Sequence, residues 1–294
     1  MMKILVTGAT GFIGRNLKEQ LSSRHEVFAP GRDELDLLDA SGVASYLQAH
    51  RFDVVIHAAT WNATRNSTKD TARTLENNLR MFFNLARMNG SYGKMLYFGS
   101  GQEFGRPHCM PRMKEEFFDE HIPEDPYGFS KYIMAQHALR SNNIFNLRCF
   151  GVFGKYEDWE IRFISNACCK ALWDLPITIK RNVLFDYLHI DDLVRIVEKF
   201  IGSEPREKVY NVCTGRTYDL EALAKKVLKA SGKELPIRIA LPGLDKEYSG
   251  DNTQLIRDLG PVMFEDMDDS IAKLYAWYGA RKDKIDRDLL LFDK

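Results

Sequence analysis

A glycine-rich turn near the N-terminus constrains the fold of this chain more than any other feature. The apolar segment 3–7 precedes the turn, and a helix-like segment, residues 15–23, follows it. The turn carries a glycine at every third position, namely Gly8, Gly11 and Gly14. The first strand-to-helix turn of a doubly wound sheet has this pattern because the backbone there comes close to a pyrophosphate at the helix N-terminus. We therefore expect a strand, a tight turn and a helix that together bind a dinucleotide.

The N-terminal half continues as an alternation of short apolar segments and helix-like segments. Further strands are expected over residues 26–29, 53–57, 95–98 and 144–147. Further helices are expected over residues 41–50, about 70–88 and 128–140. Strands that are apolar throughout and alternate with helices are typical of a parallel sheet with helices on both faces. The sequence therefore predicts an α/β fold built on a doubly wound parallel sheet.

The balance of charges excludes several kinds of partner. Lysine and arginine together number 41, as do aspartate and glutamate, so no net field attracts nucleic acid or an anionic membrane. No apolar segment approaches the ~18 residues that a membrane span requires. Thr7 and Gly8 interrupt the N-terminal apolar segment too early for a signal peptide. We expect a cytoplasmic protein with neither nucleic acid nor membrane as a partner.

The five cysteines show none of the spacings that bind metals, so we expect no metal site. They are Cys109, Cys149, Cys168, Cys169 and Cys213. An odd number without such spacing is typical of reduced thiols in a cytoplasm. The adjacent Cys168 and Cys169 have two interpretations, a redox pair or two packing residues of a helix.

The end of the second expected strand indicates which dinucleotide binds. Enzymes that select NAD usually carry an acidic residue there, which holds the ribose hydroxyls. Residues 27–32 read Val-Phe-Ala-Pro-Gly-Arg, so the acid is missing and Arg32 follows. A guanidinium suits the 2′-phosphate of NADP. We therefore expect NADP as the cofactor. The alternative is that Arg32 lies in solvent and that the cofactor is NAD.

A tyrosine, a lysine and a serine form the group that can carry chemistry. Tyr127 and Lys131 are four residues apart and so share one face of the expected helix, while Ser100 follows the fourth strand. Reduction of a ketone needs a proton donor, and the unperturbed tyrosine pKa of about 10 is high for this task. An ammonium ~5 Å away favours the phenolate by roughly 3 kcal/mol, about two pKa units. We expect Lys131 to lower the pKa of Tyr127, and Ser100 to donate a hydrogen bond to the same carbonyl.

With these residues in place, the sequence resembles the extended branch of the short-chain dehydrogenase/reductase superfamily, which comprises nucleotide-sugar epimerases, dehydratases and reductases. The matches are residues 7–14, 53–59, Asn78, Ser100, Tyr127, Lys131, 186–192 and 210–212. The resemblance implies a Rossmann domain and a smaller, interleaved C-terminal domain that binds a nucleotide sugar, with the active site between them. The expected boundaries are 1–155 plus about 182–215 for the first, and about 156–181 plus 216–294 for the second.

The resemblance also assigns residues to the cofactor. Asp36 matches the position that contacts adenine, and Ala58 and Ala59 match the strand end that lines the cofactor. Asn78 matches a position near the site, where helix capping or packing is the alternative. The complete expected set is Gly8, Thr10, Gly11, Phe12, Ile13, Gly14, Arg32, Asp36, Leu37, Ala58, Ala59, Asn78, Tyr127 and Lys131.

Departures from the family narrow the expected reaction. Residues 32–39 are similar to GDP-fucose synthases, which are NADPH-dependent ketoreductases. Sugar 4,6-dehydratases carry an Asp-Glu pair after the catalytic serine or threonine, whereas this chain has Gly101 and Gln102. The cysteine and histidine with which GDP-fucose synthases epimerise C3 and C5 correspond to Gln102 and approximately to Arg162. We expect an NADPH-dependent reductase of a nucleotide-linked 4-keto-6-deoxy sugar; the alternatives are a 4-epimerase that retains NAD and a regulator that binds NADP without turnover.

The candidates for substrate contacts each have a structural alternative. Basic residues would bind the diphosphate or lie in solvent, and a buried histidine would face the sugar or support the fold. The expected set is Gln102, Arg148, Arg162, Lys180, Arg181, His189 and Tyr248. Gly151 and Lys155 stand where the family usually has asparagine and proline, which predicts an unusual sugar pocket.

An apolar face on the expected helix 70–88 bears on assembly. Residues 81–83 of this helix read Met-Phe-Phe. Related enzymes pair through such helices, so the resemblance implies a homodimer, and core packing of the same residues is the alternative.

Overall fold

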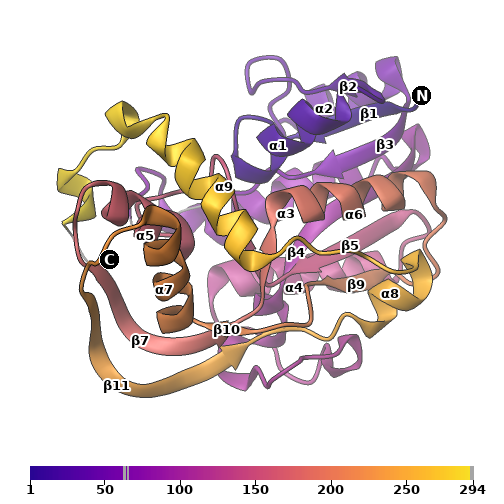
Figure 1. The fold of residues 1–294 in the computed structure, drawn as a ribbon. Coiled ribbons are helices and arrows are strands. Elements are labelled where there is room, and N and C mark those ends of the chain that lie inside the picture. The colour runs from indigo at the N-terminus through magenta and orange to yellow at the C-terminus, as the bar shows by residue number, and fades with distance from the viewer. Residues whose placement is uncertain (62–63, 65, 292–294) are drawn as a thin grey trace.

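The centre of the protein is a parallel sheet of six strands (Figure 1). The computed structural model describes residues 1–61, 64 and 66–291. The strands lie in the order β2-β1-β3-β4-β5-β9, and each neighbouring pair is parallel. Their bounds are β1 Lys3–Thr7, β2 Glu26–Phe28, β3 Phe52–His57, β4 Tyr92–Ser100, β5 Ile144–Cys149 and β9 Val209–Val212. The predicted doubly wound α/β fold is confirmed.

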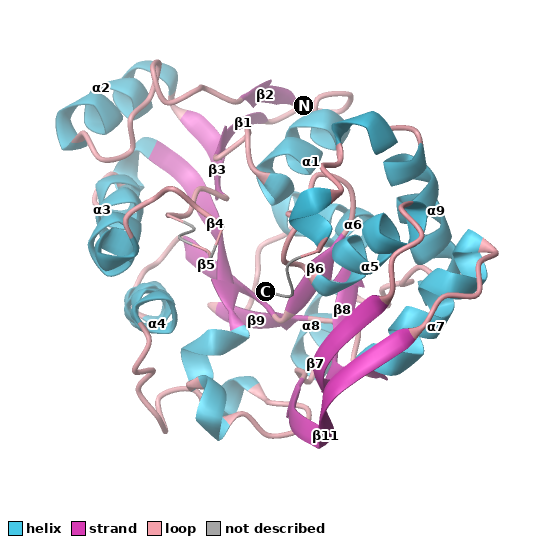
Figure 2. Ribbon diagram, turned by 90° about the vertical axis from the view of Figure 1, so that its left-hand side faces the viewer, coloured by secondary structure: helices cyan, strands magenta, loops and turns pink. Residues whose placement is uncertain are grey.

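Helices cover both faces of this sheet (Figure 2). The helices on one face are α2 (Ala40–His50), α3 (Thr74–Ala86) and α4 (Pro126–Leu139). The helices on the other face are α1 (Phe12–Leu21) and α6 (Ile190–Gly202). In β1, Ile4 and Val6 join the core beneath α1 and α6, whereas Leu5 joins the core beneath α2 and α3. Because successive side chains point to opposite faces, a strand covered on both sides is apolar throughout.

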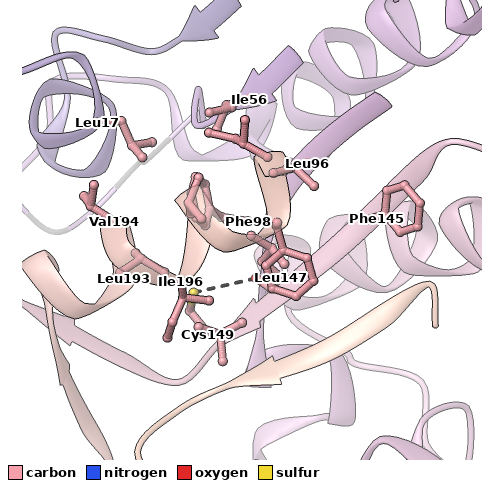
Figure 3. Close-up of a cluster of buried hydrophobic side chains, with 14 of the residues drawn as sticks. Leu17, Ile56, Leu96, Phe98, Phe145, Leu147, Cys149, Leu193, Val194 and Ile196 are labelled. Atoms are coloured by element: carbon pink, nitrogen blue, oxygen red, sulfur yellow. Dashed lines mark hydrogen bonds between the residues drawn. The ribbon is translucent and has the colours of Figure 1, made fainter. Parts of the chain in front are cut away.

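Figure 3 shows the core between the sheet and helices α1 and α6. Leu17 of α1 and Val194 of α6 lie against strand residues such as Ile56 and Leu147. The Cys149 thiol lies 3.6 Å from the Leu147 carbonyl oxygen, and burial raises the pKa of this thiol to about 12. Cys149 is therefore a packing residue of this core.

The expected elements are all present, with their ends displaced by a few residues. The helix expected over residues 70–88 begins as a short 3-10 helix, η1 (Thr71–Arg73), because the Asp70 carboxylate accepts a hydrogen bond from Ala72 N.

Strand β9 was not among the expected strands. Its central residue, Asn211, is polar yet fully buried, and its side chain donates to the Met113 carbonyl at 2.8 Å. This buried amide interrupts the apolar pattern by which a short strand is normally found.

A second, smaller sheet lies beside the first and has its own core (Figure 1). Strand β7 (Ile177–Phe185) pairs in parallel with β11 (Ile237–Tyr248) and antiparallel with β10 (Tyr218–Asp219). The helices that share this core are α5 (Phe163–Leu172), α7 (Leu220–Ser231) and α9 (Met267–Gly279). The remaining elements are the strand pair β6 (Gly151–Phe153) and β8 (Tyr187–His189) and the helix α8 (Thr253–Leu259). The smaller C-terminal unit is thus present, and its residue boundaries stay a prediction.

Burial gives a packing role to two cysteines and to two residues of α3, and the expected homodimer stays a prediction. Cys168 and Cys169 lie in the core around α5 as free thiols, and burial raises the pKa of both. Packing is therefore the structural role that this chain gives them. On α3, Met81 and Phe82 lie in the core beneath the sheet, and Phe83 is half-buried.

Among the described residues, no helix is both long enough and apolar enough to cross a bilayer.

The core beneath α6 predicts a measurable difference between two leucines. Leu193 is 0% exposed and Leu244, on β11, is 63% exposed. Leu193→Ala should lower the free energy of unfolding by about 2–5 kcal/mol, because it leaves a cavity. Leu244→Ala should change it by less than about 0.5 kcal/mol. Urea unfolding measures both, and equal losses would contradict the placement of α6.

Candidate active site

The glycine turn brings the ends of β1 and β3 into contact. Gly8 has φ +70°, and a Cβ atom there would lie 2.6 Å from the backbone of Ala59. A Cβ atom on Gly14 would lie 2.3 Å from the Gly8 carbonyl oxygen. Both positions therefore require glycine. Helix α1 begins after Gly11, which supplies no side-chain cap, so the first N–H groups of the helix are free to meet a ligand.

An unpaired amide lies beside this turn. Asn78 of α3 is 1% exposed, and its Oδ1 accepts hydrogen bonds from Trp61 N at 2.6 Å and from Thr60 Oγ1 at 3.2 Å. Its Nδ2 has no partner among the described residues. Thr60 and Trp61 follow Ala59 at the end of β3, where the strand order reverses. Such a switch point is where open α/β sheets bind ligands, so the turn and the free amide fit a bound dinucleotide.

The other residues expected at the cofactor differ in exposure and in the contacts that they make. Arg32 forms an exposed ion pair with Asp36 at 3.2 Å, so the two are already joined. Leu37 and Ala59 belong to the core beneath α2 and α3. The remaining positions differ in exposure: Thr10 is exposed, whereas Phe12, Ile13 and Ala58 are half-buried and pack against the core on the opposite face.

Ser100, Tyr127 and Lys131 meet at the carboxyl edge of the sheet. Ser100 ends β4, and the other two lie on α4, whose N-terminus is fixed by the Asp125 carboxylate accepting from Gly128 N at 2.7 Å. The Ser100 hydroxyl lies close enough to the Tyr127 phenol for a hydrogen bond between them to lower the pKa of the phenol. Lys131 Nζ donates to the Phe98 carbonyl at 2.7 Å and lies 5.8 Å from the centre of the Tyr127 ring.

The electrostatics of this group differ from the expectation. We expected Lys131 to lower the pKa of Tyr127, but enclosure raises the pKa of this phenol in the structure. Arg162 and the hydrogen bond with Ser100 oppose the rise, and Arg162 has the larger effect. Burial also lowers the pKa of Lys131 to about 8, although the Glu103 carboxylate acts to raise it. The expectation was wrong because it left out the loss of solvent around both groups.

Glu103 is a residue of this region that the sequence analysis did not select. It lies on the 3-10 helix η3 (Gly101–Phe104) and is fully buried. Its carboxylate accepts hydrogen bonds from Ser100 N at 3.0 Å and from Asn146 Nδ2 at 2.9 Å. A Cβ atom on Gly99 would lie 2.3 Å from this carboxylate. The pattern Ser-x-x-Glu, which marks a capping box, was the signal available in the sequence.

Arg148, expected at the substrate, is instead the ionic partner of Glu103. Its Nε donates to Glu103 Oε2 at 2.7 Å, and both side chains are 0% exposed. Its Nη1 donates to Asn211 Oδ1 at 3.3 Å, and its guanidinium lies 4.4 Å from the centre of the Phe104 ring. The structure therefore places this charge inside the protein beneath Ser100 and not on a surface open to a ligand.

Tyr248 and Gln102 lie beside the reactive group. Tyr248, at the end of β11, is buried and hydrogen-bonded with Ser100. Gln102 N donates to Ser100 Oγ at 3.2 Å. The Arg106 guanidinium, which the sequence analysis did not select, lies 4.7 Å from the centre of the Tyr248 ring. Residues 100–106 and the end of β11, which are distant in sequence, therefore meet at Ser100.

The remaining expected substrate residues lie on other elements, with His189 on β8, Lys180 and Arg181 on β7, and Arg162 directly before α5. His189 caps α6, where its Nδ1 accepts from Asp191 N at 3.4 Å. Lys180 and Arg181 are exposed on β7. Arg162 is exposed directly before α5 and is close enough to Tyr127 to influence its pKa. Of these four residues, only Arg162 has an electrostatic effect on Tyr127 that places it near the phenol.

Known proteins show similarity over most of this chain. Residues 4–213 match the model of the NAD dependent epimerase/dehydratase family. The UDP-glucose 4-epimerase of Bacillus subtilis is 26% identical, and the match covers 94% of this chain and 96% of that protein. The GDP-6-deoxy-D-mannose reductase of Pseudomonas aeruginosa is 25% identical over 80% and 82% of the two chains. The crystal structure of UDP-glucose 4-epimerase from Thermotoga maritima has a TM-score of 0.83 at 21% identity, covering 95% and 99%.

The protein therefore belongs to the NAD dependent epimerase/dehydratase family, because the family model spans residues 4–213 of its 294. The structural likeness extends over the C-terminal sheet and shows that the whole fold is shared. The two curated relatives carry different activities in their names, an epimerase and a reductase. Membership of the family thus leaves the reaction to be argued from the site.

The buried ion pair beneath Ser100 predicts an asymmetric mutational effect. Glu103→Ala should lower the free energy of unfolding by about 3–5 kcal/mol, because it leaves the Arg148 charge buried without its partner. Joint replacement, Glu103→Leu with Arg148→Met, removes both charges and should be less destabilising than Glu103→Ala alone. Urea unfolding compares the two, and a larger loss in the joint variant would contradict the pairing.

Proposed function

We propose that this protein is an NADPH-dependent reductase of a nucleotide-linked 4-keto-6-deoxy sugar. The observation that carries the proposal is the pair of neighbouring hydroxyls, Ser100 and Tyr127, at the sheet edge that also holds the glycine turn. A carbonyl oxygen placed against both hydroxyls accepts two hydrogen bonds, which stabilise the negative charge that develops during reduction.

In this proposal, Tyr127 is the proton donor. The bound dinucleotide supplies the hydride that the sugar C4 receives. Because enclosure raises the pKa of Tyr127, the phenol is protonated at neutral pH and is ready to give its proton to the developing alkoxide. An epimerase would first need this group as a base toward a sugar hydroxyl. It would then use the same group as an acid, so the choice of reduction rests on the missing acid at the end of β2.

Lys131 and the second-sheet residues complete the proposed site. A protonated Lys131 stabilises the negative charge that Tyr127 gains when it gives up its proton. The buried Glu103 carboxylate acts to keep this lysine protonated. We place the sugar against Gln102 and Tyr248, which lie beside Ser100. The substrate diphosphate would meet Arg162, with Lys180 and Arg181 as further candidates on β7.

The choice of NADP rests on the end of β2. No acidic residue stands there to hold ribose hydroxyls, and Arg32 offers a guanidinium for a 2′-phosphate.

One observation favours the second candidate, a 4-epimerase that retains NAD. In the structure Arg32 is paired with Asp36, so binding of a 2′-phosphate must compete with this exposed ion pair. The pair is weak enough for a phosphate to displace, because both partners are exposed to solvent.

The proposed activity is tested with NADPH and a panel of 4-keto sugar nucleotides. The unmodified protein should consume NADPH with at least one of them. Tyr127→Phe should lower turnover by ~10²–10⁴, because the proton donor is lost, while dinucleotide binding stays within about twofold. Phe129→Tyr, which adds a phenol two residues along the same helix, serves as a control and should leave turnover unchanged.

Three results would each redirect the interpretation. Inversion of a 4-hydroxy sugar nucleotide without added cofactor would establish the epimerase. Unchanged dinucleotide binding in Tyr127→Phe, with no turnover by either protein on any substrate, would indicate a regulator that binds NADP. Full turnover by Tyr127→Phe would exclude the proposed proton donor.

The pKa of Lys131 predicts the basic limb of the pH profile. Burial lowers this pKa to about 8, so the ammonium is present below that pH and is lost above it. In the proposed reaction kcat/KM should be level between pH 6 and 7 and fall about tenfold per unit well above pH 8. Lys131→Arg keeps a charge that does not titrate there and should remove this limb. The same limb in both proteins would assign it to another group.

A further inference from the structure

A cavity of about 340 Å³ lies on a part of the molecule that the proposed reaction does not use. It is open to solvent on one side and is lined by three separate segments: α1, the loop that follows β6, and the C-terminal end of α9 with the residues after it. None of the residues assigned above to the sugar, the proton or the glycine turn lines it. Its volume lies within the range of about 300–1,000 Å³ that is usual for small-molecule sites.

The lining of the cavity is positively charged. Arg15, Arg281 and Lys284 contribute cations, and no aspartate or glutamate is among the described lining residues. The Glu19 carboxylate of α1 does not line the cavity but lies next to it, where it accepts from Lys155 Nζ at 2.7 Å and from the Tyr156 hydroxyl at 2.6 Å. Arg15 acts to lower the pKa of Glu19, so this carboxylate balances part of the Arg15 charge. An anion that enters still meets three cations around one concave site.

The walls of the cavity are aromatic. Trp159, Trp277, Tyr156 and Tyr278 line it. The Arg15 guanidinium lies 4.3 Å from the centre of the Tyr156 ring, and the Arg281 guanidinium lies 4.4 Å from that of Trp277. The Tyr156 and Trp277 rings meet edge to face at 5.1 Å. Arginines stacked on rings in this way are held in place and cover one face of each ring, so a planar ligand would stack on the guanidinium groups and on the remaining ring surface.

The backbone of this wall is also held in an unusual conformation. Tyr156 has φ +74°, a region that a bulky residue rarely adopts. The conformation is fixed by its neighbours, because Asn16 Nδ2 donates to the Lys155 carbonyl at 3.0 Å and the Tyr156 hydroxyl donates to Glu19. Residues in such conformations persist where the surroundings over-determine them, as at ligand sites. The wall is therefore preorganised before a ligand arrives.

We infer that this cavity binds a planar aromatic ligand that carries a phosphate or carboxylate group. The ring would lie against Trp277 and Tyr156, and the anionic group would meet Arg15, Arg281 and Lys284. Arg15 comes directly after Gly14, the last glycine of the turn, so a ligand here contacts the same helix that the proposed dinucleotide contacts. The inference does not depend on the reaction proposed above.

Calorimetric titration of the full chain tests this assignment. The probes are uridine monophosphate, guanosine monophosphate and benzoate, with uridine and inorganic phosphate as the halves of one probe. We expect at least one anionic ring compound to bind at least about tenfold more tightly than uridine or phosphate, because each half lacks one of the two contacts. The joint variant Arg15→Gln/Arg281→Gln should weaken this binding by at least about tenfold, and Trp277→Leu should weaken it too. Both arginines are on the surface, and thermal melting verifies that the variants are folded.

A matched control separates this cavity from the proposed substrate site. Arg162→Gln removes a cation near Tyr127 and should leave the binding unchanged. A nucleotide preference would identify a nucleoside phosphate as the ligand, and a benzoate preference an aromatic acid. Binding that survives loss of Arg15 and Arg281 but disappears with Arg162→Gln would overturn the inference, as would the absence of binding by every probe at 10 mM.

Discussion

The close approach of two backbone segments at the glycine turn is the constraint on which the rest of the structure depends. Gly8 leaves β1 directly against Ala59 at the end of β3, and no side chain fits between them. The contact fixes the carboxyl ends of both strands at the point where the strand order reverses. The start of α1, the Asn78 amide nitrogen, which has no partner among the described residues, and the end of β4 are thereby brought to one edge of the sheet. The chemistry proposed for Tyr127 takes place along this edge.

Burial, rather than the pattern of charges in the sequence, sets the electrostatics of the site. The lysine one turn beyond Tyr127 loses solvent together with the phenol, so both groups shift toward their neutral forms. Glu103 and Arg148 are enclosed side by side, and their pairing leaves the exposed Arg162 as the cation that most affects Tyr127. A phenol that stays protonated is suited to donate a proton.

The sequence predicted the sheet, the glycine turn and the meeting of Ser100 with α4, because these features follow from local patterns of period and spacing. It could not place Arg148, whose role depends on Glu103 reaching it from a different strand end. It assigned His189 to the sugar as one option, whereas the cap that this residue provides to α6 requires the geometry of a helix start. Pairings of this kind are non-local, so neither composition nor spacing reveals them. The aromatic cavity at Trp277 likewise joins segments that only the fold brings together.

The most direct test of the central claim follows a labelled hydrogen into the product. NADPH that carries two deuterium atoms at C4 of the nicotinamide is incubated with the 4-keto sugar nucleotide that is consumed, and the product is analysed by mass spectrometry and proton NMR. Direct delivery beside Tyr127 predicts one deuterium at the sugar C4, with a new hydroxyl at the same carbon. A product without deuterium, or with deuterium at another carbon, would contradict the proposed reduction.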